Sequence, residues 1–184
     1  MTLRHLPASD RAATAWRNGG GVTREVLAEP PGEQFAWRLS LADVDSDGPF
    51  SSFPGCGRII TVLRGSGMAL TVDGVTHVLD RRFVPFPFDG GATTECRLLA
   101  GSVVDFNVIH RHDTPVTVDI HAEPVTLGPL PRAVVVALDN PVGVRAAGRH
   151  IDLAPLDALD LVDEASLQLM TGMVALIRVS GRTP

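Results

Sequence analysis

The stretch FAWRLSLADVDSDGPFSSFPGCGRIITVLRG, residues 35–65, sets the pattern for the rest of the chain. Its first seven residues alternate, so that the apolar side chains share one face of a predicted strand and Arg38 and Ser40 share the other. A polar connection rich in glycine and proline follows, and then a second apolar run, residues 58–63. This order predicts two strands joined by a long loop, with an arginine and a serine on one face.

Short strand-like runs recur through the first 120 residues, separated by turn signals. The strongest is a hairpin in which Asp73-Gly74, a preferred two-residue turn, separates two strand-like runs. No helical period of useful length appears in this part of the chain, while residues 153–163 allow one short helix. The pattern is typical of an all-β sandwich or barrel.

The second part of the chain repeats features of the first. Three pairs of residues match, namely Arg58 with Arg132, Gly74 with Gly148, and Gly101 with Gly172. The offset is 74 residues in the first two pairs and 71 in the third, which indicates an internal duplication. Asp105 in the first copy then corresponds to Leu176 in the second, so we expect any chemistry in the first copy. The alternative is a chance similarity among valine-rich strands.

Composition argues against several classes of function. The chain has 184 residues, a formal net charge of −5 and no lysine, whereas a nucleic-acid binder usually carries a basic patch. No window reaches the length of a membrane span, and the first residues lack the apolar core of a signal peptide. We therefore expect a cytoplasmic protein with no nucleic-acid partner and no membrane partner.

The histidines and cysteines do not predict a metal site or a nucleophile. Of the six histidines, only His110 and His112 form a close pair, and no third ligand follows at a fitting spacing. Cys56 and Cys96 carry no catalytic signature, and the chain has no G-x-S-x-G motif. We predict no metal, no cofactor and no catalytic residue. Should a metal be found, His77, His110 and His112 are the ligands to test.

Asp105 and Asn107 are the most unusual polar pair, because they share one face of an otherwise apolar strand. Two hydrogen-bonding groups that point into a barrel need partners. Arg38 and Ser40 could supply them, and so could a ligand. A ligand pocket and a purely structural Arg–Asp pair both fit this pattern.

Seven pieces of sequence occur together and in order. They are Trp16-Arg-Asn-Gly-Gly-Gly, Trp37-Arg-Leu-Ser-Leu-Ala42, Asp47-Gly-Pro-Phe-Ser51, Phe53-Pro-Gly55, Arg58, Pro85-Phe-Pro-Phe88 and Asp105-Phe-Asn107. As a set they resemble the HutD/Ves family, through about the first 110 residues. The chain departs from the family after Asn107, where Val108-Ile-His-Arg-His112 stands in place of a more basic ending.

The resemblance implies an all-β fold of two cupin-like barrels (RmlC-like jelly rolls) packed as a bicupin. Residues 1–115 would form the barrel that carries the motifs, and residues 116–184 a degenerate second barrel. The resemblance also implies a cytoplasmic bacterial protein linked to histidine utilisation, with no established enzymatic activity. A non-catalytic, regulatory protein that binds a small carboxylate such as urocanate or formylglutamate is the function it suggests, and a homodimer is compatible with it.

The expected ligand contacts combine the polar strand faces with the glycine-rich segment. They come from Asn18, Arg38, Ser40, Arg58, Asp105 and Asn107. A buried arginine needs an anionic partner, which would be Asp105 in the empty protein and a ligand carboxylate in a bidentate fork when it is occupied. Two other functions stay open: a metal-independent cupin enzyme, of isomerase or lyase type, that uses Asp105 or His110 for acid–base work, and a structural partner of another protein.

Overall fold

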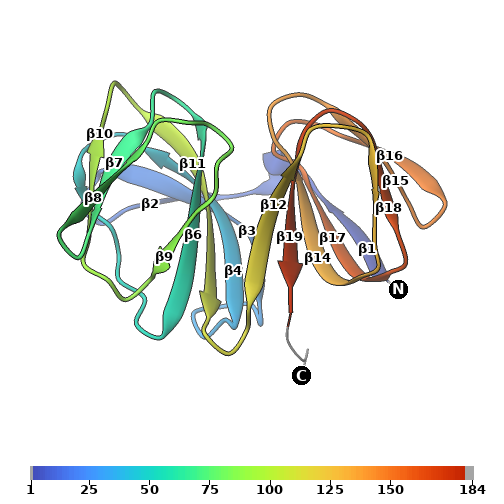
Figure 1. Ribbon diagram of the computed structural model, residues 1–184, viewed down its shortest axis with the longest axis horizontal. Coiled ribbons are helices and arrows are strands. Elements are labelled where there is room, and N and C mark those ends of the chain that lie inside the picture. Colours follow the sequence, from blue (N-terminus) through green and yellow to red (C-terminus); the bar gives the residue numbers. More distant parts are fainter. Residues whose placement is uncertain (1, 181–184) are drawn as a thin grey trace. The chain divides into compact units, whose positions relative to one another are not determined.

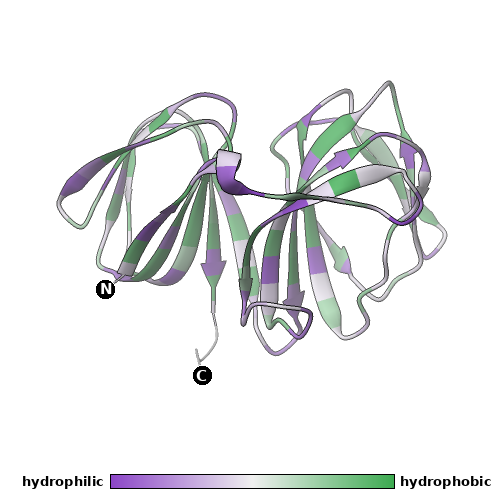
Figure 2. Ribbon diagram, turned by 180° about the vertical axis from the view of Figure 1, so that it is seen from behind, coloured by the Kyte–Doolittle hydropathy of each residue, from purple (hydrophilic) through white to green (hydrophobic). Residues whose placement is uncertain are grey.

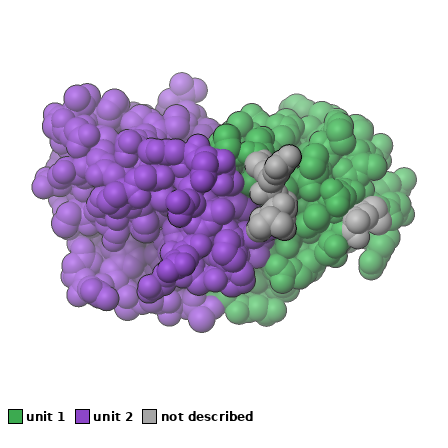
Figure 3. All heavy atoms as spheres, turned by 90° about the horizontal axis from the view of Figure 1, so that it is seen from below, with its two compact units in different colours: residues 1–11, 115–184 green, residues 12–114 purple. Residues whose placement is uncertain are grey.

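The computed structural model describes residues 2–180, and it is built almost entirely of β-strands (Figure 1). The only helical segment among these residues is a single 3-10 turn, Ala8–Asp10. The chain divides into two compact units, which Figure 3 shows in purple and green. We call residues 12–114 the N-terminal unit, and residues 2–11 together with 115–180 the C-terminal unit. No helix in this part of the chain has the length and apolar character needed to cross a membrane.

The N-terminal unit consists of two antiparallel sheets. Its strands are β2 (Ala13–Ala15), β3 (Gly21–Glu29), β4 (Trp37–Val44), β5 (Gly48–Pro49), β6 (Cys56–Arg64), β7 (Met68–Val72), β8 (Val75–Leu79), β9 (Phe86–Asp89), β10 (Thr94–Leu98) and β11 (Val103–Arg111). The larger sheet has the order β2-β3-β4-β11-β6-β9 and the smaller one β5-β10-β7-β8. Apolar side chains from both sheets, including Val62, Leu70 and Val103, form the interior.

The C-terminal unit is built in the same way. Its strands are β1 (Thr2–Leu6), β12 (Val116–His121), β13 (Val125–Leu127), β14 (Leu130–Ala137), β15 (Val142–Ala146), β16 (Arg149–Leu153), β17 (Ala158–Glu164), β18 (Leu167–Thr171) and β19 (Val174–Val179). The sheet orders are β1-β17-β14-β19-β12 and β13-β18-β15-β16. Figure 2 shows the apolar residues of both units distributed along the strands.

The strand orders of the two units correspond one to one. The run β9-β6-β11-β4 of the N-terminal unit matches β17-β14-β19-β12, and β5-β10-β7-β8 matches β13-β18-β15-β16. The units differ at their edges, because β3 and β2 continue the sheet beyond β4, while β1 continues the other sheet beyond β17. The sequence assigns residues 1–115 to the first barrel. In the structure, β1 pairs with β17, so residues 2–11 belong with the C-terminal unit.

The matched glycines lie at equivalent turns. Gly74, which joins β7 to β8, has a φ of 82°, and Gly148, which joins β15 to β16, has a φ of 71°. The residue before each glycine, Asp73 or Ala147, also has a positive φ, as a two-residue type I′ hairpin turn requires. Gly101 and Gly172 likewise have positive φ in the β10–β11 and β18–β19 connections. The backbone therefore supports the duplication that the sequence indicates.

The match of Arg58 with Arg132 is wrong by one residue. Ile60 and Val62 of β6 point into the interior of the N-terminal unit. Their counterparts in the C-terminal unit are Ala133 and Val135 of β14, so equivalent residues of these two strands are 73 positions apart. The connection from β14 to β15 is one residue longer than that from β6 to β7. Since a shift of one residue exchanges the faces of a strand, Arg132 points away from the interior and pairs with Asp160, whereas Arg58 points inward.

The short helix that residues 153–163 allow is absent from the structure, which has a strand there. Leu159 and Leu161 of β17 point into the interior, and Asp160 between them points to the other face. This alternation pairs β17 with both β1 and β14. The leucine spacing fits a helical period loosely. Strand pairing on both sides gives residues 158–162 backbone hydrogen-bond partners and outweighs that weak preference.

Candidate functional site

The candidate site lies on the interior face of the larger sheet of the N-terminal unit. Three neighbouring strands, β4, β11 and β6, place side chains side by side because directly opposite residues of antiparallel strands share a face. The rows across these strands are Arg38–Ile109–Arg58, Ser40–Asn107–Ile60 and Ala42–Asp105–Val62. Polar groups therefore gather in the first two rows, and the third row adjoins the apolar interior of this unit.

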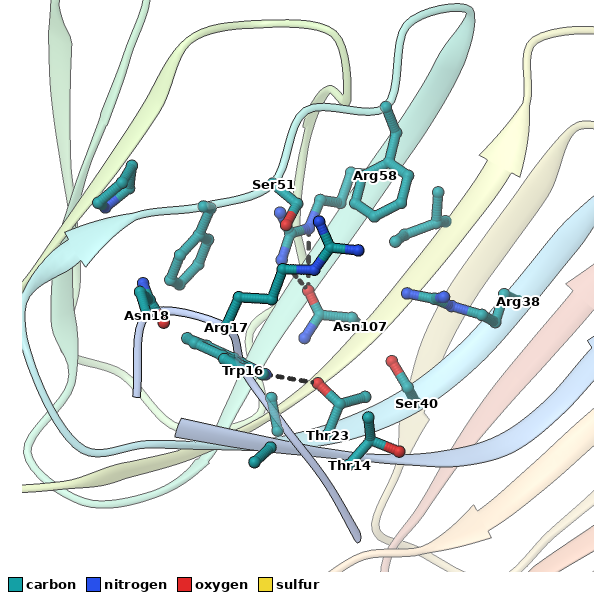
Figure 4. Close-up of a pocket in the computed structure, with 16 residues that line it drawn as sticks. Thr14, Trp16, Arg17, Asn18, Thr23, Arg38, Ser40, Ser51, Arg58 and Asn107 are labelled. Carbon is teal, nitrogen blue, oxygen red and sulfur yellow. Dashed lines mark hydrogen bonds between the residues drawn. The ribbon is translucent and has the colours of Figure 1, made fainter. Parts of the chain in front are cut away.

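A cavity of about 640 Å³ opens over these rows (Figure 4). Its walls come from β4, β6 and β11, from the β2–β3 hairpin and from the loop after β5. The lining residues are Thr14, Ala15, Trp16, Arg17, Asn18, Thr23, Arg38, Ser40, Ala42, Pro49, Phe50, Ser51, Phe53, Arg58, Asn107 and Ile109. Five of the six expected site residues are among them, and the sixth, Asp105, is buried beneath Asn107 and does not line the cavity.

Arg58, Asn107 and Asp105 form a continuous hydrogen-bonded chain. Arg58 donates from Nε and from Nη2 to the Asn107 side-chain oxygen, at 2.9 and 2.7 Å. Asn107 donates from Nδ2 to Asp105 Oδ1. All three side chains are buried, so these bonds form in a poorly screened environment where each is strengthened. The amide holds the guanidinium and the carboxyl group in fixed positions relative to each other.

Burial has the largest effect on the pKa values of Asp105 and Arg58, the two ionisable members of this hydrogen-bonded group. It raises the pKa of Asp105 to about 7, although Arg58 and the hydrogen bond from Asn107 oppose the rise by favouring the carboxylate. Burial also lowers the pKa of Arg58 to about 10, and Asp105 opposes this change. Arg58 is therefore charged at neutral pH, while Asp105 lies close to its titration point.

Arg38 is not paired with Asp105, contrary to the expectation from the sequence. The groups that Asp105 responds to are Arg58, Asn107 and Asp43. The Arg38 side chain donates no hydrogen bond to any described residue, and its buried Nε atom has no partner among residues 2–180. The strand faces were predicted correctly, but Asn107 and Asp105 engage the arginine of β6 rather than that of β4. Arg38 is thus left with hydrogen-bonding capacity directed at the cavity (Figure 4).

Aromatic rings support both guanidinium groups. The Arg38 guanidinium carbon lies 5.1 Å from the centre of the Phe35 ring and 5.6 Å from that of Phe53. Arg58 lies over Phe50, at 4.9 Å, and over Phe88, at 5.6 Å. Cation–π contacts of this kind stabilise a cation without consuming its N–H donors. The arginines can therefore be held in place and still bind an anion.

The glycine-rich segment forms the hairpin between β2 and β3. The Trp16 ring nitrogen donates to Thr23 Oγ1 at 2.8 Å, and the Asn18 side-chain oxygen accepts from the Gly20 backbone at 3.1 Å. Gly21 passes so close to the Asp43 carbonyl oxygen that a Cβ atom would clash with it. The glycines thus allow a tight backbone turn, and Asn18 is committed in part to that turn.

Several lining residues were not identified as site residues from the sequence, namely Arg17, Thr23, Phe50, Ser51 and Phe53. Four of them lie within the Trp16-Arg-Asn and Asp47-Gly-Pro-Phe-Ser-Ser-Phe segments that carry the family resemblance. The family motifs could therefore have identified these four residues as site candidates. Strand alternation could not, because it does not predict where side chains of loops and hairpin turns point. Figure 4 shows Arg17 extending over the same space as Arg38 and Arg58.

The histidines and cysteines lie outside this arrangement. No three of His, Cys, Asp or Glu in the described range 2–180 lie close enough together to hold a metal ion. The His110 ring packs against Gly57 and contacts the Arg111 carbonyl oxygen at 3.0 Å, and His112 is 4.0 Å from Asp89. Cys56 and Cys96 are free thiols. None of these side chains lines the cavity.

Comparison with known proteins connects these features to a family. The sequence model of the family described as HutD matches residues 8–176. An uncharacterised 21.2 kDa protein in the hutC 3′ region of Pseudomonas putida is 45% identical over 111 residues, which cover 59% of this chain and 58% of that protein. Protein Ves of Citrobacter koseri is 42% identical over 114 residues, covering 60% of this chain and 56% of the relative. The matched segments thus span less than two thirds of these two relatives.

Solved structures extend the similarity to nearly the whole chain. HutD from Pseudomonas fluorescens superimposes with a TM-score of 0.87 at 31% identity, covering 99% of this chain and 100% of the other. A cupin 2 conserved barrel domain protein from Leptotrichia buccalis superimposes with a TM-score of 0.63 at 10% identity, over 87% of this chain and 89% of that one. At such low identity the second match concerns the fold alone, and it supports a cupin-like fold, as the sequence resemblance implies.

Proposed function

The chain belongs to the HutD family, and from this premise we propose that it is a non-catalytic protein that binds a small carboxylate metabolite. We further propose that binding serves a regulatory role in histidine utilisation. The position of one relative in the hutC 3′ region supports that link. Urocanate and formylglutamate are the carboxylates we would test first.

The observation that carries this proposal is the charge of the cavity wall. The side chains of Arg17, Arg38 and Arg58 line it, and no aspartate or glutamate does. An anion that enters meets three cations and no carboxylate in the lining, in a protein whose formal net charge is −5. The charge at this site is therefore positive, whereas the net charge of the whole molecule is negative.

The geometry suits a carboxylate in particular. Arg38 has unused donors in the fixed planar fork that binds a carboxylate through two parallel hydrogen bonds. Ser40 and Thr23 line the same cavity and offer neutral hydroxyl groups to the other polar atoms of a ligand. A cavity of about 640 Å³ is within the range of sites for small metabolites.

A metal-independent isomerase or lyase is the second candidate, and the near-neutral pKa of Asp105 favours it. Asp105 would need contact with the substrate, however, and Asn107 separates it from the cavity. His110, the other acid–base candidate, does not line the cavity. These positions support binding over turnover.

The test is isothermal titration calorimetry with urocanate and N-formyl-L-glutamate. Arg38→Ala should abolish binding while circular dichroism shows a folded protein, and Arg38→Lys should bind poorly because the charge stays but the fork is lost. Arg64→Ala is the matched control, since Arg64 is an exposed arginine at the end of the same strand as Arg58. Parent-like binding by both Arg38 variants would place the ligand elsewhere, and product formation during incubation would favour the enzyme.

We also propose the finer architecture and the cellular setting that the family resemblance implies. The one-to-one strand order of the two units supports two jelly-roll barrels arranged as a bicupin. A cytoplasmic location and a homodimer are the corresponding proposals for the cell and for the assembly. Fractionation of the source cells and sedimentation of the purified protein would test them.

A further inference from the structure

The floor of the cavity contains one amide that joins a buried cation to a buried acid. The Asn107 oxygen accepts two hydrogen bonds from Arg58, and its nitrogen donates to Asp105. The acceptor end of the amide thus faces the positive charge and the donor end faces the carboxyl group. Any change in charge at Arg58 is therefore felt at Asp105 across a single polar group.

Asp105 is incompletely satisfied in this arrangement. The residue is 0% exposed, and its second oxygen, Oδ2, is buried without a hydrogen-bond partner among residues 2–180. An ionised carboxylate in this position is costly unless a cation compensates it. Arg58 provides this compensating charge, and because Arg58 also lines the cavity, an anion there would interact with the same guanidinium group.

The charged and titratable groups around Asp105 come from three strands. Arg58 of β6 favours the carboxylate, Asp43 of β4 disfavours it, and Cys96 of β10 interacts with both Asp105 and Arg58. Arg38 acts on Arg58 from β4. Burial outweighs Arg58 and raises the pKa of Asp105 to about 7, so near neutral pH a modest change at Arg58 alters the protonation of Asp105.

We propose that an anion bound at Arg58 causes Asp105 to take up a proton, so that ligand binding and protonation of this buried carboxyl group are coupled through Asn107. This inference rests on the proposed function, because it assigns a regulatory property to the same cavity. The charges balance at each stage. Above about pH 7 the Asp105 carboxylate offsets Arg58 in the empty site. In the occupied site the ligand carboxylate offsets Arg58, and one proton from solvent neutralises Asp105.

The sign of the effect follows from linkage. The bound anion disfavours the Asp105 carboxylate, so the pKa of Asp105 is higher in the complex than in the empty protein. Affinity is then greatest below about pH 7, where Asp105 is already protonated, and falls as the pH rises towards the pKa of the complex. Ordinary carboxylate ligands do not produce this slope, because their own groups stay ionised above pH 6.

Calorimetric titration with N-formyl-L-glutamate at pH 6 and pH 8.5 tests the coupling. The dissociation constant should rise about tenfold between the two, with net proton uptake revealed by buffers of different ionisation enthalpy. Asp105→Asn keeps the size and the acceptor oxygen but cannot titrate, so its affinity should be independent of pH, without proton uptake. Glu95→Gln is the control, since it removes an exposed carboxylate of β10 that does not act on Asp105 and should keep the pH dependence.

A measurement without ligand separates this inference from the proposed function. Carbon-13 NMR of the Asp105 carboxyl group in the empty protein should show titration near neutral pH, and in Arg58→Gln at a higher pH because the cation is gone. Titration near pH 4 would overturn the coupling whatever binds. Binding of equal strength at both pH values would overturn the coupling and leave the proposed function. Failure to bind, with the NMR response present, would overturn the proposed function and the ligand-driven proton uptake, and would support only the electrostatic link between Arg58 and Asp105.

Discussion

The N-terminal unit keeps a cavity of about 640 Å³ on the interior face of its larger sheet, whereas fifteen buried apolar residues make up the interior of the C-terminal unit. Two features differ between the units. The β2–β3 hairpin, which walls the cavity, extends the sheet beyond β4 and has no counterpart beyond β12. Side chains at corresponding positions of the shared strands differ as well. Asp105 in one unit corresponds to Leu176 in the other, and Asn107 corresponds to Arg178.

The charged groups of the two units are also handled differently. Arg178 pairs with Asp119 on the neighbouring strand, so the C-terminal unit satisfies this arginine internally. Burial lowers the pKa of Arg38 and the charge of Glu25 acts to raise it, but the Arg38 side chain donates no hydrogen bond to a described residue and faces a cavity. A duplicated fold can thus keep an open cavity in one copy and a filled interior in the other, through an added hairpin and changes on interior strand faces.

The largest expected effect comes from placing an aspartate in the C-terminal unit, at the position that corresponds to Asp105. Leu176→Asp would bury a carboxyl group among apolar side chains, without an arginine–amide chain to stabilise it. We expect a loss of about 4 kcal/mol in the free energy of unfolding. Urea unfolding followed by circular dichroism measures it, with Met170→Asp at an exposed position of β18 as the control. A loss below about 1 kcal/mol would mean that the interior of the C-terminal unit tolerates a buried carboxyl group as well as that of the N-terminal unit does.

A second test separates the two arginines of the cavity. Arg58→Ala removes the partner of Asn107 and Asp105, so we expect a loss of about 3 kcal/mol, greater above pH 7 where Asp105 is ionised. Arg38→Ala breaks no hydrogen bond to a described residue and should cost less than about 1 kcal/mol. Both tryptophans, Trp16 and Trp37, lie in this unit, so their fluorescence follows its unfolding. Equal losses in the free energy of unfolding would contradict the expectation that, of these two arginines, only Arg58 contributes to stability.

A third test uses pH. The pKa of Asp105 is raised by burial to about 7, above its unfolded value near 4, so the native state binds the proton more tightly. Stability therefore decreases as the pH rises from about 4 to about 7 and changes little above that. Asp105→Asn should remove this decrease and stabilise the protein by about 2 kcal/mol at pH 8. Thermal unfolding of both proteins at pH 5 and pH 8 would show the difference, and identical slopes would argue against it.

The smallest expected effect concerns the turns that the units share. Gly74 and Gly148 both have positive φ, and a Cβ atom at either position would meet nothing within 4 Å. Replacement of either glycine by alanine should cost about 1 kcal/mol, through backbone strain alone. Chemical denaturation of the two variants should give similar losses, and a large difference between them would show that the hairpins are not equivalent.

The sequence predicted the parts of this molecule that depend on local alternation. Arg38 and Ser40 share a face with Asn107, as expected, because strand periodicity depends only on neighbouring residues. The partner of Asp105 could not be predicted, since alternation gives the face of a residue but not the strand beside it. Arg17 was missed for a related reason, because its position depends on how a hairpin lies over the sheet.

The hairpin of β2 and β3 gives the cavity a particular capacity for change. Trp16, Arg17 and Asn18 lie at its turn, and β2 is a three-residue strand at the edge of its sheet. Substitutions or insertions there alter one wall without disturbing the interior strands that carry Arg38 and Arg58. Evolution can therefore adjust the shape of the cavity at the hairpin at little cost to the stability of the sheet.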